Sequence, residues 1–235
     1  MTDLIDLEAI NQSLKGRSAE TVLDWVLESF SPEDVVVSSS FQTQSVPLLH
    51  LISQRAPELS VLFLETGFHF PQTLSFRDRL IQQLGLTVRT LKPEEFPPKP
   101  TFAEDTRACC ALNKTAPLEK VLKTASVWIT GVRRDQTSHR SRMNTVERHH
   151  TGVLKVHPML EWTELQIEQY LKQHPQLPQH PLTAQGYSSI GCYPCTAPGS
   201  GREGRWPDSV RSECGVQGCP IGGKEDFHEN APAQL

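Results

Sequence analysis

The sequence lacks any apolar run near the roughly 20 residues that a membrane-spanning helix needs. It also lacks an apolar stretch near its beginning, where Asp3, Asp6 and Glu8 lie instead. A signal peptide requires such a stretch, so we expect a cytoplasmic protein with no membrane partner. Structural disulfides are rare in the cytoplasm, and clustered cysteines there more often bind metals or take part in catalysis.

An excess of positive charge is also missing. The 235 residues carry 23 Lys and Arg against 27 Asp and Glu, which gives a formal net charge of −4. No overall basic field exists to hold a nucleic-acid backbone, so we expect no nucleic-acid partner. The hydrophobic fraction of 37% is typical of a globular chain with a buried core.

Short apolar strands alternate with helical segments along most of the chain. We expect strands over 34–38, 60–64, 86–91, 126–130 and 153–156, and helices over 19–30, 45–53, 71–84 and 163–172. Strands that are apolar throughout indicate an α/β fold, a parallel sheet covered by helices on both faces. Beyond about Thr196 the pattern gives way to Gly, Pro, Arg and Ser. We therefore predict one domain over 1–195 and a mobile, loop-rich tail over 196–235.

A polar loop, Ser38-Ser39-Ser40, joins the first predicted strand to a helix. Ligands of parallel sheets bind beyond the carboxyl ends of the strands. Hydroxyls and backbone N–H groups at a helix N-terminus suit an oxyanion such as phosphate. The loop has no Gly-Lys-Ser/Thr and is not a Walker loop. An ordinary polar turn is the alternative.

A basic loop follows the strand predicted over 126–130. It begins at Gly131 and contains Arg133, Arg134, Arg140 and Arg142. Guanidinium groups at the end of a strand can hold phosphate or sulfate through paired hydrogen bonds. The alternative is a solvated loop whose arginines pair with nearby carboxylates.

The cysteines suggest a metal site. Adjacent Cys109 and Cys110 form a poor disulfide with each other, but they can join Cys192 and Cys195 at one centre. These four residues can ligate zinc or an iron–sulfur cluster, and an adjacent pair is unusual for structural zinc. Four buried reduced thiols are the remaining alternative. Lys114 lies one turn from Cys110 if this segment is helical, where its ammonium would offset the charge of ligated thiolates.

Cys214 is a candidate nucleophile in the Gly-rich tail. A reactive cysteine must be accessible and readily ionised, and the nearby Arg202, Arg205 and Arg211 favour its thiolate. An incidental free thiol is the alternative.

Together these motifs resemble the assimilatory sulfonucleotide reductases, which act on adenylyl sulfate (APS) or phosphoadenylyl sulfate (PAPS). The motifs that carry the resemblance are, in order, Ser38-Ser39-Ser40-Phe41, Glu65-Thr66-Gly67, Cys109-Cys110 with Lys114, the segments 131–136, 186–195 and 202–206, and Glu213-Cys214-Gly215. The resemblance implies an adenine-nucleotide alpha-hydrolase-like fold. It also implies a 4Fe-4S cluster on Cys109, Cys110, Cys192 and Cys195, which favours APS as the substrate. A PAPS-specific or dual-specificity reductase is the alternative.

The mechanism that the resemblance implies has two stages. The Cys214 thiolate attacks the sulfur of APS, AMP leaves, and an S-sulfocysteine forms. Thioredoxin or glutaredoxin then attacks this cysteine and releases sulfite. The residues implied to hold the nucleotide are Ser38, Ser39, Ser40, Glu65, Thr66 and Gly67. Those implied around the phosphosulfate are Lys114, Gly131, Arg133, Arg134, Gln136, Arg140, Arg202 and Arg205.

The chain departs from the family pattern at several positions. Glu65 stands where the family usually has Asp, Asn113 where it has Arg, and Gln217 where it has the His of the tail. Cys219 has no counterpart in the pattern. It can be a spare thiol, or it can resolve S-sulfo-Cys214 internally and leave a Cys214–Cys219 disulfide for thioredoxin.

Two rival functions differ in class. An ATP-pyrophosphatase-type thiolation enzyme would carry a Ser-Gly-Gly-x-Asp-Ser loop, whereas this chain has Ser38-Ser39-Ser40-Phe41-Gln42-Thr43. A non-catalytic module would use zinc to join the cysteines. The sequence leaves homo-oligomerisation open.

Overall fold

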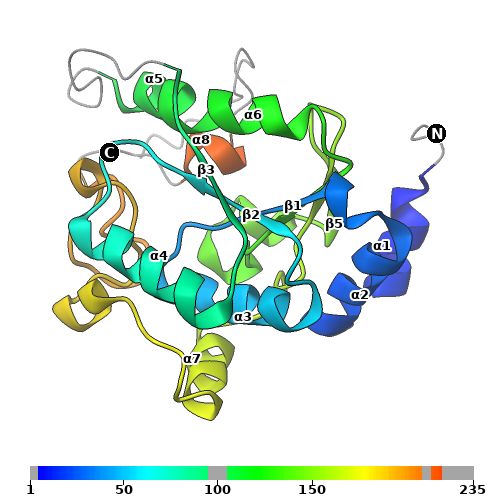
Figure 1. The fold of residues 1–235 in the computed structure, drawn as a ribbon, viewed down its shortest axis with the longest axis horizontal. Helices are drawn as coiled ribbons and strands as arrows, with labels where there is room; N and C mark the ends of the chain where they lie inside the picture. Colours follow the sequence, from blue (N-terminus) through cyan, green and yellow to red (C-terminus); the bar gives the residue numbers. More distant parts are fainter. Residues whose placement is uncertain (1–4, 95–104, 208–212, 219–235) are drawn as a thin grey trace, which may run out of the picture.

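One mixed sheet forms the centre of the protein (Figure 1). The structure is a computed structural model that describes residues 5–94, 105–207 and 213–218. The sheet order is β3-β2-β1-β4-β6-β5. Its strands are β1 (Val35–Ser38), β2 (Ser60–Leu64), β3 (Val88–Leu91), β4 (Val127–Thr130), β5 (Val146–Arg148) and β6 (Leu154–Val156). The first four and β6 are parallel, which confirms the predicted α/β sheet.

The edge strand β5 was not predicted from the sequence. It pairs antiparallel with β6, with Val146 opposite Val156 and Arg148 opposite Leu154. Only Val146 of its three residues is buried, so the strand has neither an apolar run nor a clear alternation. An antiparallel edge on a parallel sheet is common in such folds.

Local signals explain most helix boundaries. The helices are α1 (Leu7–Leu14), α2 (Ala19–Ser29), α3 (Val46–Arg55), α4 (Pro71–Leu84), α5 (Thr106–Cys110), α6 (Ala116–Leu122), α7 (Glu164–Gln173) and α8 (Gly215–Gly218). Pro71 begins α4, and Gly85 ends it in the left-handed conformation at φ 63°. Thr163 caps α7 by accepting a hydrogen bond from the Gln166 N–H. None of the described helices is both long and apolar enough to cross a bilayer.

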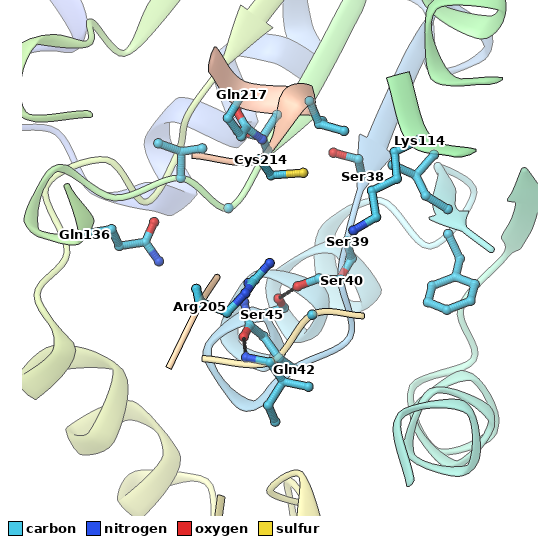
Figure 2. A pocket seen from close by; sticks show the side chains of 18 of the residues that line it. Ser38, Ser39, Ser40, Gln42, Ser45, Lys114, Gln136, Arg205, Cys214 and Gln217 are labelled. Atoms are coloured by element: carbon cyan, nitrogen blue, oxygen red, sulfur yellow. Dashed lines mark hydrogen bonds between the residues drawn. The ribbon is translucent and has the colours of Figure 1, made fainter. Parts of the chain in front are cut away.

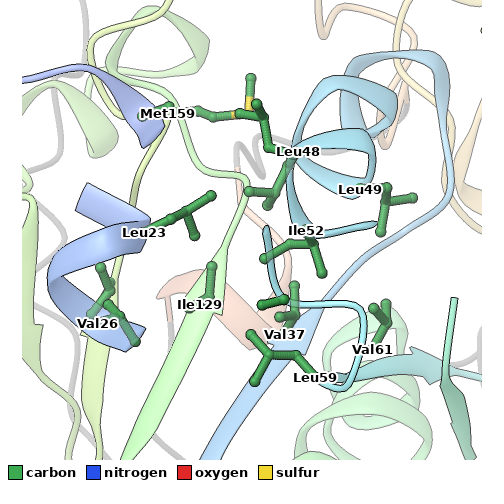
Figure 3. Packing of buried hydrophobic residues seen from close by; sticks show 14 of the residues in the cluster. Leu23, Val26, Val37, Leu48, Leu49, Ile52, Leu59, Val61, Ile129 and Met159 are labelled. Carbon is green, nitrogen blue, oxygen red and sulfur yellow. The ribbon is translucent and has the colours of Figure 1, made fainter. Parts of the chain in front are cut away.

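Apolar clusters cover both faces of the sheet. The larger cluster joins Val37, Val61 and Ile129 of the sheet to α2 and α3, as Figure 3 shows. The smaller cluster packs Trp128 and Leu62 against α6 on the other face. Val216 of α8 packs against this second cluster, so the described part of the tail is attached to the body of the protein.

The start of the predicted tail is also attached. Thr196 forms an isolated antiparallel β-bridge with Arg205, and the Trp206 N–H donates to the carbonyl of Cys195 at 3.0 Å. Residues 208–212 and 219–235, which include Cys219, lie outside the described part of the chain. The division at 195/196 stays a prediction.

Candidate active site

A cavity opens where β1 and β4 end (Figure 2). Parallel strands place their carboxyl ends at one edge of a sheet, so loops far apart in sequence meet here. Many predicted site residues line this cavity: Ser38, Ser39, Ser40, Lys114, Gly131, Gln136, Arg140, Arg202, Arg205 and Cys214. In Figure 2, Cys214 and Lys114 lie on one side of the space and Arg205 on the other.

The serine loop is fixed by its own hydroxyls. Ser39 Oγ accepts a hydrogen bond from the Phe41 N–H at 3.1 Å, and the hydroxyls of Ser40 and Ser45 lie 3.2 Å apart. Ser38 Oγ accepts from Trp128 Nε1 at 2.8 Å. Phe41 takes the left-handed conformation at φ 49°, which is uncommon for a residue with a side chain, and its ring is fully buried. The burial of this ring stabilises a turn that would otherwise be strained.

The Glu65-Thr66-Gly67 turn lies beside the cavity rather than in its lining. The Glu65 carboxylate accepts a hydrogen bond from the Gly67 N–H at 2.9 Å. Gly67 has φ 75°, a value that glycine adopts without steric cost. Thr66 is buried, and its Oγ1 lies 3.3 Å from Cys192 Sγ. The turn therefore connects the strand ends to the cysteines.

Two of the predicted phosphosulfate arginines do not line the cavity. Arg133 is buried, bonds the Asp135 carboxylate at 3.0 Å and donates to Gln44 Oε1 at 2.9 Å. Arg134 is partly exposed and pairs with Glu161 at 2.7 Å. Both guanidinium groups are held by carboxylates in this structure.

Arg140 lines the cavity and holds the tail. Its Nε and Nη2 donate to the two oxygens of the Glu213 carboxylate at 2.8 and 2.7 Å. The Thr137 hydroxyl donates to Glu213 Oε1 at 2.5 Å, and Arg202 Nη2 lies 3.8 Å from Oε2. This carboxylate immediately precedes Cys214 in the chain.

The four predicted metal ligands line one smaller cavity. Cys109 and Cys110 of α5 face Cys192 and Cys195 there, and Lys114 lies between this cavity and the larger one. The sequence prediction that these two pairs meet is consistent with the fold.

A π-helical turn, Ala111–Thr115, places Lys114 between the two cavities. The Ala116 N–H donates to the Ala111 carbonyl, five residues back. Pro117 has no N–H to offer the Asn113 carbonyl, which removes the ordinary α-helical bond at this point. Such π-turns within helices are frequent at functional sites.

The donor set of the small cavity fits a four-iron cluster. Within the described ranges, no three Cys, His, Asp or Glu side chains come close enough to hold a single metal ion. In a 4Fe-4S cluster the four thiolates bind the cluster as a whole, so their sulfurs lie further apart than around one ion. Asn113 Nδ2 lies 3.5 Å from Cys109 Sγ, and Thr66 Oγ1 approaches Cys192 Sγ. Donors of this kind around sulfur ligands are typical of cluster sites.

Positive charge surrounds Cys214. Its pKa is lowered well below the usual thiol value: a hydrogen bond with Cys110 has the largest effect, burial opposes it, and Lys114 and Arg205 lower it further. Burial alone would lower the pKa of Lys114, but the cysteines around it, Cys192 and Cys214 foremost, raise it overall. Lys114 is therefore an ammonium, and its charge together with that of Arg205 favours the Cys214 thiolate.

Arg205 reaches the cavity from the tail. Its guanidinium stacks over the Trp206 ring at 4.5 Å, and its Nε makes no hydrogen bond within the described residues. Burial lowers the pKa of Arg205, and the nearby cysteines, Cys214 first, oppose this shift. Burial also lowers the pKa of Arg202, to about 10, with Arg140 and Arg205 adding to the effect.

Sequence reasoning missed several lining residues, among them Gln42, His69, Ile190 and Gly191. Gln42 Oε1 accepts a hydrogen bond from the Ile190 N–H at 2.8 Å, which joins the serine loop to the segment before Cys192. A Cβ on Gly191 would lie 2.4 Å from Arg205 Nη2. Gln42 and Gly191 lie within or beside the quoted motifs, but only the packing shows why those positions matter.

The arrangement matches a known family. A model of the phosphoadenosine phosphosulfate reductase domain matches residues 34–198. The chain belongs to the phosphoadenosine phosphosulfate reductase family. Two curated relatives, both named adenosine 5'-phosphosulfate reductase, come from Rhodococcus opacus and Bacillus cytotoxicus. The first is 36% identical, covering 87% of this chain and 90% of the relative, and the second is 35% identical, covering 90% and 95%.

A solved structure shares the fold of this reductase-family chain. The phosphoadenylyl-sulfate (PAPS) reductase of Candida auris aligns with a TM-score of 0.71 at 22% identity, covering 81% of this chain and 95% of that one. An FMN adenylyltransferase from Candida glabrata aligns with a TM-score of 0.60 at 14% identity, covering 77% of this chain and 64% of that one. Both alignments support the nucleotide-binding α/β fold predicted from the sequence.

Proposed function

We propose that this protein reduces APS to sulfite and AMP through an S-sulfocysteine on Cys214. The observation that carries the proposal is the shared cavity at the strand ends, where the Cys214 thiol lies with Lys114 and Arg205. A thiolate and an anionic phosphosulfate repel each other, and these cations reduce that repulsion. The curated relatives named as APS reductases support the same reaction.

The reaction is a displacement at sulfur. The Cys214 thiolate forms a bond to the sulfur of APS, the bond from that sulfur to the bridging oxygen breaks, and AMP leaves with the electron pair. A dithiol donor, thioredoxin or glutaredoxin, then attacks the Cys214 sulfur. Sulfite leaves with two electrons, and the donor ends as its own disulfide after resolving its bond to Cys214. We place the reaction in the cytoplasm, where cysteine thiols are kept reduced.

Some residues of the larger cavity would bind the nucleotide, and others would bind the anionic phosphosulfate. Ser38, Ser39 and Ser40 offer hydroxyls and backbone groups at the end of β1 for the nucleotide. Lys114 and Arg205, with Arg202, surround the sulfur that Cys214 would attack. Their fixed charges need little rearrangement during the reaction, which is the condition for strong electrostatic stabilisation.

Cys109, Cys110, Cys192 and Cys195 would hold a 4Fe-4S cluster beside this site. When bound, its contribution would be electrostatic, next to the sulfate. Lys114 lies between the two cavities and would balance ligated thiolates on one side and the substrate anion on the other. This position explains why a lysine, rather than a neutral residue, belongs on the π-turn.

PAPS is the alternative substrate. The matched domain family is named for PAPS, whereas the curated relatives are named for APS. The four cavity cysteines favour APS through the family resemblance. The thiolation alternative has less support, because the serine loop has neither glycines nor an acidic residue.

The decisive experiment is sulfite release from APS and PAPS with thioredoxin present. We expect release from APS, and a Cys214→Ser variant slower by about 10⁴-fold or more, because a hydroxyl is not ionised here and cannot replace the thiolate. Retention of the wild-type visible absorption would show that the variant keeps its cluster site. Wild-type protein that releases sulfite from neither nucleotide would refute the proposal.

Metal content tests the cofactor separately. We expect a brown protein with iron and acid-labile sulfide in equal amounts. A colourless protein with bound zinc would support the zinc-stapled module instead. The role of Cys219 stays a prediction, tested by single-turnover sulfite release without thioredoxin in wild type and Cys219→Ser: an unchanged yield would contradict internal resolution.

A further inference from the structure

The contact between Glu213 and Arg140 assigns a role to a residue that the proposed reaction leaves unused. We propose that Glu213 is a positioning residue, whose carboxylate is held by Arg140 so that the next residue, Cys214, faces the substrate. The inference rests on the proposed function, because it concerns the placement of the nucleophile. It also changes the role predicted for Arg140 from a phosphosulfate ligand to an anchor for the tail.

The geometry of this ion pair is specific. Arg140 donates Nε and Nη2 to the two carboxylate oxygens of Glu213 at 2.8 and 2.7 Å, a side-by-side pair that fixes orientation as well as distance. The Thr137 hydroxyl donates to Oε1 at 2.5 Å. Arg140 is itself held, because its Nη1 donates to Gln136 Oε1. The carboxylate thus meets a rigid set of donors from one loop.

The pair is buried. The Arg140 side chain is 7% exposed and the Glu213 side chain 10%. Loss of one partner of a buried ion pair leaves an uncompensated charge, which is far more costly than loss of an exposed pair. This cost couples the position of Glu213 to the loop after β4.

The Cys214 thiol also hydrogen-bonds Cys110, but the remaining tail contacts do not fix its direction. Val216 packs against the smaller apolar cluster, and the Gln217 N–H donates to the Cys214 carbonyl at 2.9 Å. Apolar packing is not directional, and the second bond lies within the tail itself. Glu213 therefore supplies the directional contact that joins the tail beside Cys214 to the loop after β4.

The division of labour among the arginines follows. Arg140 faces the cavity, but two of its nitrogens are directed at Glu213 and a third at Gln136. Arg205 approaches Cys214 from the other side and bonds no carboxylate within the described residues. Arg140 thus anchors the tail, and the cations on the Arg205 side bind the anion of the substrate.

The test compares Glu213→Gln, Arg140→Gln and the double variant with wild type in three assays on the cluster-containing, full-length protein. The first is alkylation of Cys214 by iodoacetamide without substrate, at a pH where the thiol is ionised in every variant. Tandem mass spectrometry separates Cys214 from Cys219. The second is equilibrium binding of AMP, and the third is the single-turnover rate of S-sulfonation at saturating APS.

We expect Glu213→Gln to raise the alkylation rate about tenfold and to slow S-sulfonation about 10²-fold, because a misplaced nucleophile loses its alignment. AMP affinity should stay within about twofold, since the nucleotide contacts are elsewhere. The double variant should be no slower than either single variant, because each single variant already removes the same Glu213–Arg140 contact. Glu213→Asp should recover part of the rate. Glu203→Gln, which alters an exposed carboxylate of the same tail, is the matched control and should behave as wild type.

Two results would overturn the inference. One is wild-type alkylation and S-sulfonation in Glu213→Gln. The other is an Arg140→Gln variant with unchanged alkylation but weakened nucleotide binding, which would make Arg140 a substrate ligand. A wild-type protein without S-sulfonation would refute the proposed reaction, yet the alkylation assay would still decide whether Glu213 holds the tail.

Discussion

The arginines after β4 and Arg205 of the tail have similar sequence surroundings and opposite environments. Arg133, Arg134 and Arg140 bond the carboxylates of Asp135, Glu161 and Glu213, respectively. Arg205 instead stacks on Trp206 and faces Cys214 across the cavity. In sequence both groups are basic clusters in polar loops, and both were predicted to bind phosphosulfate.

The difference shows that a basic loop and an anion site are separate properties. A guanidinium that already bonds a carboxylate contributes to structure, because a second anion would have to displace the first. A guanidinium stacked on an aromatic ring keeps its N–H edge available to a ligand. The partner of each arginine, rather than its number in the chain, separates the two roles.

The largest expected effect is a loss of activity when Arg205 of the tail is replaced. Arg205→Ala should lower kcat/KM for APS by about 10² to 10³-fold, because it removes a fixed charge beside the reacting sulfur. Steady-state sulfite release measures this change, and Arg134→Ala is the control on the loop side. Equal losses of kcat/KM in Arg205→Ala and Arg134→Ala would contradict the distinction between the tail and the loop after β4.

The loop side should respond in stability instead. Arg133→Met should lower the free energy of unfolding by about 2 to 3 kcal/mol, because it leaves the Asp135 carboxylate without its buried partner. Urea denaturation measures the loss. The comparison predicts that the KM for APS of the remaining folded protein stays near the wild-type value, and a KM raised tenfold or more would contradict it.

Gly191→Ala tests the placement of Arg205 without changing any charge. The new Cβ would lie 2.4 Å from Arg205 Nη2, so the flexible guanidinium must move. We expect kcat/KM to fall about tenfold with little loss of stability, since a 1 Å displacement can cost up to about 10²-fold. Gly152→Ala, where a Cβ meets nothing within 4 Å but φ is 92°, is a control with the reverse expectation: lower stability and unchanged kcat/KM.

The smallest effect is expected at Arg134. Its pair with Glu161 is partly exposed, so Arg134→Met should cost less than about 1 kcal/mol of stability. Urea denaturation beside Arg133→Met gives a matched pair from adjacent positions. A loss of unfolding free energy equal to that of Arg133→Met would show that burial does not distinguish the Arg133 and Arg134 ion pairs.

Much of the fold was predictable because its signals are local. The strand over 60–64 and the helix over 71–84 match β2 and α4 residue for residue, since apolar runs, Pro71 and Gly85 mark their ends. Helix α1 was missed, although Asp6 caps it by accepting from two backbone N–H groups. Strand β5 was missed because three residues with one buried side chain carry no periodic signal.

The candidate site was predictable in its residue types and less so in its contacts. Sequence reasoning brought Cys214 and Lys114 to one site, and both line the cavity. It gave Arg133 the same role as Arg205, because a partner such as Asp135 or Gln44 can be recognised only once the chain is folded. Gly191 lies within the quoted segment 186–195, but its role there was not predictable, since it depends on an arginine fourteen positions later.

The sequence by itself determined the family, the parallel sheet and the cysteines to which we assign the chemistry, because these depend on residue type, order and local periodicity. Only the tertiary structure decided which arginines line the cavity at the strand ends and which bond carboxylates, and Arg140 does both. It also decided that Glu213 bonds Arg140 across a sequence separation of 73 positions. Electrostatic roles depend on distance and burial, and neither can be predicted from the order of residues along the chain.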